Sequence, residues 1–106
     1  MTHYAIANLT DVDLGAGIVE YLERIDATLA PYDGHFIVHG HEPEHLEGVW
    51  AGALIVIEFP GYEAARGWYD SAAYQEILPL RTDNSEGVTM LVEGVDRDHV
   101  ATDVLH

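Results

Sequence analysis

Residues 51–59, Ala-Gly-Ala-Leu-Ile-Val-Ile-Glu-Phe, restrict the fold more than any other part of the chain, because they are apolar at both odd and even positions. Successive side chains of a strand point to opposite faces of its sheet, so a strand with this pattern needs cover on both faces. Pro60 and Gly61 end the segment. The pattern therefore predicts a central strand in a sheet whose two faces are both covered.

Shorter strand and helix patterns flank this central strand. Three segments have the alternation or apolar character of strands: 3–9, 35–41 and 88–92. Apolar residues recur at helical spacing in 18–29 and 62–70, and a short helical turn is expected at 74–78, ahead of Pro79. Ser71 is expected to cap that turn. The order predicts an α+β, ferredoxin-like βαββαβ domain, a four-stranded antiparallel sheet with two helices on one face.

The chain is long enough for one hydrophobic core and too short for two. Its 106 residues divide into a predicted domain at 1–95 and a C-terminal tail at 96–106, which has no clear period. Helices on one face of the sheet leave the other face uncovered, although the strands are apolar on both. We therefore expect a second copy of the chain to cover that face, in a two-fold homodimer.

Charge and cysteine content exclude several classes of function. Four arginines and no lysine stand against 19 acidic residues, giving a net charge of -15, so nucleic acids and anionic membranes would be repelled. The absence of cysteine excludes disulfides and thiolate chemistry. Hydrophobic residues, 48% of the chain, fall in runs too short to span a membrane, and the N-terminus lacks signal-peptide features. The expected location is cytoplasmic.

Seven stretches carry a family pattern: 32–40, 46–48, 57–60, 65–71, 74, 80–81 and 91–94. The most specific signal is Glu58-Phe59-Pro60 followed by Trp68-Tyr69. With these stretches the chain resembles, over residues 3–95, the family called domain of unknown function 1330. The resemblance implies a dimeric α/β barrel of ferredoxin-like subunits. It implies no function, because related folds include cofactor-free monooxygenases, isomerases and proteins with no known chemistry.

The chain departs from the usual pattern of that family around its second strand. The family pattern looks like Gly-Gly-Arg at the start of this strand and Arg-Gly-Gly at its end. Here those places hold Asp33-Gly34-His35 and His39-Gly40-His41. Histidine titrates near neutral pH whereas arginine is always charged, so anion binding by this strand is less expected here than in the family.

The same strand gives weak metal candidates. His35, His39 and His41 share parity, so an unbroken strand would point all three to one face, with His45 and Glu47 following. Imidazole and carboxylate groups of this kind could bind a divalent metal. The spacing matches no recognised metal motif, and polar surface is the simpler interpretation. No metal or other cofactor is therefore expected.

Glu58 is the one charged residue of the central strand, and Glu93 ends the last strand. Burying a lone carboxylate costs several kcal/mol, so Glu58 should pair with Arg81 or Arg66. Alternatively Glu58 lines a pocket, where burial would raise its pKa and suit it to general acid or base chemistry. The sequence leaves both interpretations open.

Trp68, Tyr69 and Tyr74 place aromatic surface near the second helix. Core packing is the common role of such residues, but with His39 and Arg81 they could also form a pocket for a small organic ligand. The candidate ligand-binding residues are Arg81, Trp68, Tyr69, Tyr74, Glu47 and Glu93.

Three functions remain after these exclusions. The first is a cofactor-independent enzyme acting on a small organic molecule, with His39 and Glu58 as acid and base and Arg81 as their electrostatic partner. The second is a non-catalytic dimer that binds a small ligand or has a structural role. The third is a histidine-based metal-binding protein.

Overall fold

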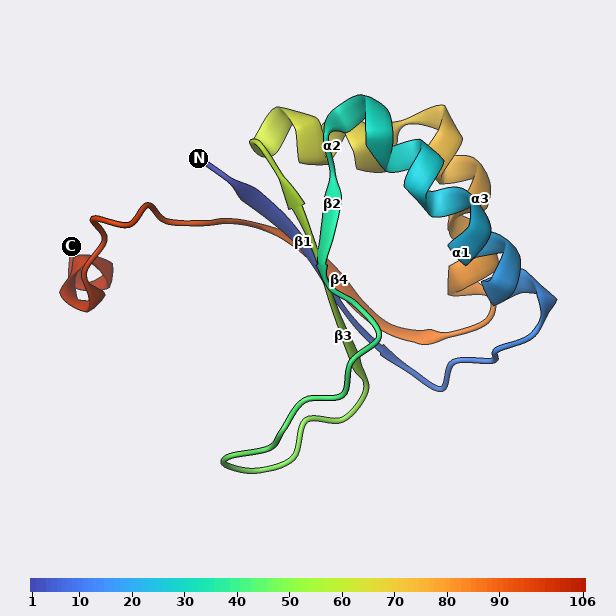
Figure 1. Cartoon of the computed structure of the whole chain (residues 1–106), viewed down its shortest axis with the longest axis horizontal. Coiled ribbons are helices and arrows are strands. Elements are labelled where there is room, and N and C mark those ends of the chain that lie inside the picture. Colours follow the sequence, from blue (N-terminus) through green and yellow to red (C-terminus); the bar gives the residue numbers. More distant parts are fainter.

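Four strands form one antiparallel sheet in the computed structural model, which describes residues 1–106. The strands are β1 (His3–Thr10), β2 (His35–Val38), β3 (Ala53–Phe59) and β4 (Glu86–Glu93), in the spatial order β2-β3-β1-β4. Figure 1 shows the sheet nearly edge-on, with α1 (Ala16–Leu29), α2 (Tyr62–Asp70) and α3 (Ala72–Thr82) on one side of it. The predicted α+β fold is confirmed, with three helices on that face where two were expected.

The third helix is longer than the predicted turn. The Ser71 side chain accepts a hydrogen bond from the backbone N–H of Tyr74, 3.2 Å away, so Ser71 caps α3 as expected. The helix then continues through Pro79 instead of ending before it. Proline within a helix costs about 3 kcal/mol. Burial of Ile77, together with the Asp83 N–H donating to the Pro79 carbonyl at 2.9 Å, holds this last turn in place.

One face of the sheet packs beneath the helices and forms the core. Ala5 pairs with Ile57 across β1 and β3, and both side chains are buried. The helices contribute the other large buried residues: Ile25, Leu29, Trp68, Tyr74 and Ile77. The core thus uses alternate residues of the central strands, as their period of two requires.

The opposite face carries apolar side chains and no helix. Ile6 lies between Val56 and Met90 in the strand register, and Met90 is 51% exposed. We call this surface the open sheet face, and its apolar residues are Ile6, Val38, Leu54, Val56, Val88, Met90 and Val92. A face of this size and composition on a small domain marks a contact surface.

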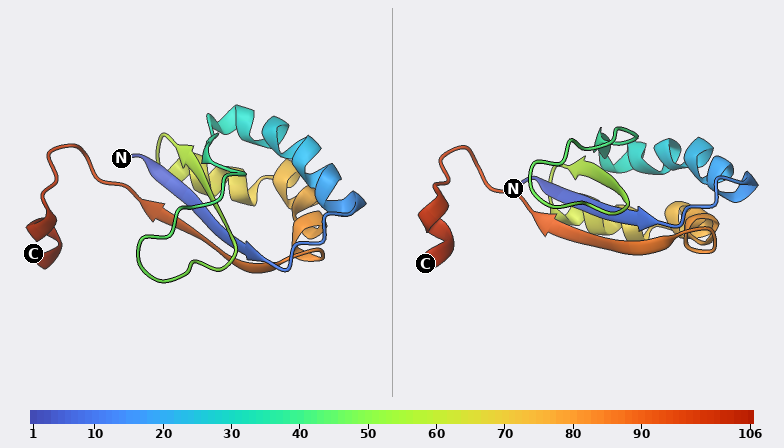
Figure 2. Two further views of the ribbon diagram at one scale, coloured as in Figure 1. Left: turned by 60° about the horizontal axis from the view of Figure 1, so that its bottom comes forward. Right: turned by 90° about the horizontal axis from the view of Figure 1, so that it is seen from below.

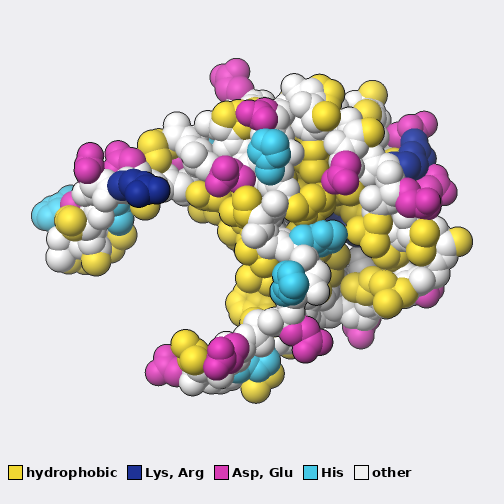
Figure 3. Space-filling model, in the orientation of Figure 1, with side chains coloured by type: hydrophobic (Ala, Val, Ile, Leu, Met, Phe, Trp, Pro, Cys, Tyr) yellow, Lys and Arg dark blue, Asp and Glu magenta, His cyan; other side chains and the backbone are white.

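Two segments extend beyond the sheet and the helices. The loop of residues 39–52, between β2 and β3, and the tail that ends in the 3-10 helix Ala101–Leu105 both project from the body (Figure 2). Hydrophobic side chains line the recess between them (Figure 3). Among the helices, none is both long and apolar enough to cross a membrane.

Candidate functional site

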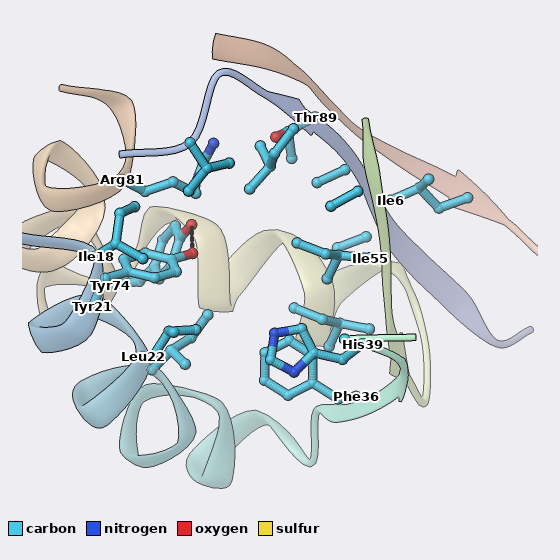
Figure 4. A pocket seen from close by; sticks show the side chains of 18 of the residues that line it. Ile6, Ile18, Tyr21, Leu22, Phe36, His39, Ile55, Tyr74, Arg81 and Thr89 are labelled. Carbon is cyan, nitrogen blue, oxygen red and sulfur yellow. Dashed lines mark hydrogen bonds between the residues drawn. The ribbon is translucent and has the colours of Figure 1, made fainter. Parts of the chain in front are cut away.

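A cavity of about 320 Å³ lies between the helices and the covered face of the sheet. We call it the helix–sheet cavity, and Figure 4 shows its lining. Sixteen of its twenty lining residues are hydrophobic when Tyr21 and Tyr74 are counted for their rings, so most of any molecule bound there would have to be apolar. The polar side chains that reach it are Tyr21, His39, Tyr74, Arg81 and Thr89.

Tyr21 and Tyr74 form one polar end of the cavity. Their hydroxyl oxygens are 2.8 Å apart and hydrogen-bonded, although 53 residues separate them in the chain. Tyr21 belongs to the apolar stripe of α1 with Ile18 and Ile25, at spacings of three and four residues. Packing of α1 against α3 therefore brings the two phenols together (Figure 4).

Arg81 lies beside these phenols because it is seven residues, or two helical turns, after Tyr74 on α3. Its guanidinium carbon is 6.0 Å from the centroid of the Tyr21 ring. Burial lowers the pKa of Arg81, but Tyr74 and Tyr21 raise it by more, so the guanidinium keeps its charge. This end of the cavity therefore carries a permanent positive charge.

The Tyr21 phenol stays protonated in the folded protein. Burial raises the pKa of Tyr21 well above its ordinary value, and the neighbouring Tyr74 raises it further, while Arg81 opposes the shift. A protonated phenol can donate its hydrogen, so the tyrosine pair is a neutral hydrogen-bonding group beside a cation.

This raised pKa predicts a loss of stability at high pH. Above pH 10 the unfolded chain releases the Tyr21 proton and the folded chain keeps it, so the free energy of unfolding falls as pH rises. We expect a loss of about 1.4 kcal/mol per pH unit from this group alone. Urea unfolding of wild type and Tyr21→Phe at pH 9, 10 and 11 measures it. Equal slopes with pH for the two proteins would contradict the shift.

His39 faces this polar end from across the cavity (Figure 4). Its ring stacks on Phe36, with 4.4 Å between ring centroids and 22° between the planes. It is the one imidazole among the lining side chains. The predicted acid or base therefore does reach a cavity.

The predicted row of histidines is wrong, because β2 is not an unbroken strand. The register against β3 shifts between Phe36 and Val38, so one extra residue changes the alternation, and the strand ends at Val38. His35 consequently lies opposite Glu58 in the sheet and bonds Asp33 at 2.9 Å, whereas His39 lines the cavity. No three His, Asp or Glu side chains come together in a way that could hold a metal ion.

Glu58 does not join His39, and the predicted site containing both is wrong for one subunit. Strand alternation turns Ile57 toward the cavity and Glu58 to the other side of the sheet. Neither predicted partner reaches Glu58, because Arg66 bonds Asp70 at 2.8 Å and Arg81 lies at the cavity. Glu58 is half-buried at the margin of the open sheet face.

The remaining candidates divide between the cavity and the surface. Trp68, Tyr74 and Arg81 line the cavity, and Trp68 is also a core residue that donates to the Thr28 hydroxyl at 3.0 Å. Three others lie outside the lining: Tyr69, Glu47 and Glu93. Sequence reasoning missed Tyr21 as a site residue. The signal that could have identified it is a tyrosine hydroxyl within the otherwise apolar stripe of a helix, because a buried hydroxyl needs a hydrogen-bond partner.

Comparison with known proteins fits this geometry. Residues 2–95 match the family described as domain of unknown function, DUF1330. The chain belongs to the DUF1330 family. No curated protein matches it. The resemblance seen in the sequence is thereby confirmed, and it covers the whole sheet, the three helices and every residue of the helix–sheet cavity.

Solved structures share the fold of this DUF1330 chain at low sequence identity. The RPA0582 protein of unknown function from Rhodopseudomonas palustris has a TM-score of 0.66 at 11% identity, covering 90% of this chain and 83% of that one. Methylated RPA0582 has a TM-score of 0.69 at 12% sequence identity, covering 92% of this chain and 84% of that one. SnoaB, a cofactor-independent oxygenase from Streptomyces nogalater, has a TM-score of 0.54 at 14% sequence identity, covering 90% of this chain and 92% of that one. The fold is that of the dimeric α/β barrel proteins.

Proposed function

We propose that this DUF1330 protein is a cofactor-independent enzyme that acts on a small, mainly apolar organic molecule held in the helix–sheet cavity. The observation that carries the proposal is an apolar cavity in which a titratable imidazole faces a neutral, donor-bearing tyrosine pair. Its volume of about 320 Å³ is near the lower limit of the range common for ligand pockets, so the substrate is small.

The two sides of the cavity supply complementary chemistry. His39 supplies an imidazole, the side chain that most often acts as a general acid or base, and catalysis of this kind contributes about 10²–10⁴-fold. Tyr21, Tyr74 and Arg81 can stabilise negative charge that develops on a substrate oxygen. SnoaB supports the proposal at the level of fold, since a protein of this fold is a cofactor-independent oxygenase.

We further propose that the working form is a homodimer in which two open sheet faces pack together. A two-fold axis places the same apolar patch of each copy against the other, which suits a self-complementary surface such as that around Ile6 and Met90. This pairing would cover the second apolar face that the central strands require.

Proton exchange on a model ketone tests the catalytic proposal. We expect the protein to accelerate exchange of the acidic C–H protons of 2-tetralone in D₂O, followed by NMR. His39→Gln should reduce the acceleration about 100-fold, because the base is lost. Ala7→Phe should abolish it by filling the cavity, since Ala7 lines its sheet side.

Ala73→Phe is the matched control, because it adds the same ring on the exposed side of α3. It should exchange 2-tetralone as wild type does. Acceleration that survives in Ala7→Phe would place the chemistry outside the cavity. Binding of 2-tetralone with no acceleration would instead support the non-catalytic alternative, in which His39 is only an aromatic wall stacked on Phe36.

A further inference from the structure

Arg81 has no carboxylate partner in a strongly acidic chain. Of the other three arginines, Arg24 bonds Glu20 at 2.8 Å and Glu76, Arg66 bonds Asp70, and Arg97, which has no ion pair, is exposed to solvent. Arg81 is partly buried, yet no Asp or Glu oxygen comes within ion-pair distance of it. A desolvated guanidinium without a counter-ion is costly, and with 19 acidic residues available its isolation needs an explanation.

The groups around Arg81 offer donors and few acceptors. Tyr21 and Tyr74 together hold two hydroxyl hydrogens, and the bond between them uses one. The second hydrogen, together with those guanidinium N–H groups of Arg81 that do not interact with the phenols, remains for a bound molecule. Apart from the phenol oxygens, the Thr89 hydroxyl and His39 across the cavity, the lining side chains are apolar, with Ile18 and Leu22 near this end in Figure 4. The end of the cavity is therefore suited to an acceptor that carries negative charge.

We propose that the ligand of the helix–sheet cavity is a small apolar molecule ending in one anionic oxygen group, a carboxylate above all, and that Arg81 is its counter-ion. This inference rests on the proposed function and names the class of its substrate. A guanidinium presents paired N–H groups that match the two oxygens of a carboxylate, and the free tyrosine hydroxyl can donate a further hydrogen bond. The apolar body of the molecule would then extend toward Phe36 and His39.

The preference for an anionic ligand is confined to the surroundings of Arg81, because the protein as a whole is negatively charged. A net charge of -15 disfavours anions in general, but salt screens charges on the surface beyond about 10 Å. Inside the cavity the nearest formal charge is that of Arg81, where the lower dielectric strengthens its effect. A neutral ligand of the same shape would leave the guanidinium unpaired and so bind more weakly.

Calorimetric titration with 2-naphthoate and 2-naphthamide tests the inference, because these two probes share a ring system and differ in the charge of the head group. Wild type should bind 2-naphthoate at least tenfold more tightly than 2-naphthamide. Arg81→Gln should lower the affinity for 2-naphthoate by about 10- to 100-fold and change the affinity for 2-naphthamide by less than about twofold. Arg81→Lys, which keeps the charge, should retain a preference for 2-naphthoate.

Arg66→Gln is the matched control, since it removes one exposed arginine from α2 and should leave both affinities unchanged. Equal weakening of both probes in Arg81→Gln, or no preference in wild type, would overturn the role of Arg81 while leaving the cavity as a ligand site. Failure of both probes to bind wild type, or binding that persists in Ala7→Phe, would overturn the proposed function itself.

Discussion

Replacing Trp68 by alanine should lower the free energy of unfolding by about 3–5 kcal/mol. The indole is 2% exposed, and its ring centroid is 4.1 Å from that of Tyr74 and 5.4 Å from that of Phe59. Alanine would leave a void among these rings and deprive the Thr28 hydroxyl of its 3.0 Å donor. Because Trp68 also lines the helix–sheet cavity, ligand binding should fall with stability.

Urea unfolding followed by far-UV circular dichroism measures this effect, with wild type and variant at one protein concentration because the proposed dimer would make stability depend on concentration. Trp50→Ala is the control. Trp50 lies in the loop after β2, is 49% exposed and donates one hydrogen bond to Asn8 at 3.2 Å. We expect Trp50→Ala to lower the free energy of unfolding by less than about 1 kcal/mol. An equally small loss in Trp68→Ala would show that the aromatic cluster is not the centre of the core.

If the proposed homodimer forms, replacing Met90 by glutamate should convert it to a monomer. Met90 neighbours Ile6 in the strand register, midway along the edge strand β4 on the open sheet face, and is 51% exposed in one chain. In a face-to-face dimer, two-fold symmetry would place one added carboxylate from each copy in the interface. Both carboxylates would lose their water, and their like charges would repel each other. We expect the dimer dissociation constant to rise at least 100-fold.

Size-exclusion chromatography with light scattering distinguishes the two states by mass. Val19→Glu adds the same charge on the outer side of α1, where Val19 is 49% exposed, and should leave the mass of two chains unchanged. Far-UV circular dichroism should show folded protein in both variants. A monomeric wild type, or a Met90→Glu protein that remains dimeric, would show that the open sheet face is not the surface that pairs.

Local patterns were sufficient to predict most of the fold. The continuous apolar run of β3 and the helical spacing of Ile18, Tyr21 and Ile25 are local patterns, so they can be recognised without tertiary contacts. Ser71 was likewise identified as a cap from its neighbours. The extent of α3 could not be predicted in this way, because packing of Ile77 against the core outweighs the local cost of Pro79.

The candidate site was less predictable, because it depends on small changes of register. A strand pattern assigns faces only if the strand is regular, and the shift after Phe36 separates His35 from His39. Glu58 illustrates the same limit. Its apolar neighbours suggest burial, either paired with an arginine or in a pocket, whereas alternation in the formed sheet places it on the side away from the helices.

The sequence by itself determined the order of strands and helices, the apolar character of both sheet faces and the family, because each of these depends on residue types at fixed spacings. Only the tertiary structure decided which polar groups share a cavity. Tyr21 meets Tyr74 through the packing of α1 on α3, and a single extra residue in β2 brings His39 to face them. Such contacts depend on how separate elements pack, and local periodicity carries no information about that packing.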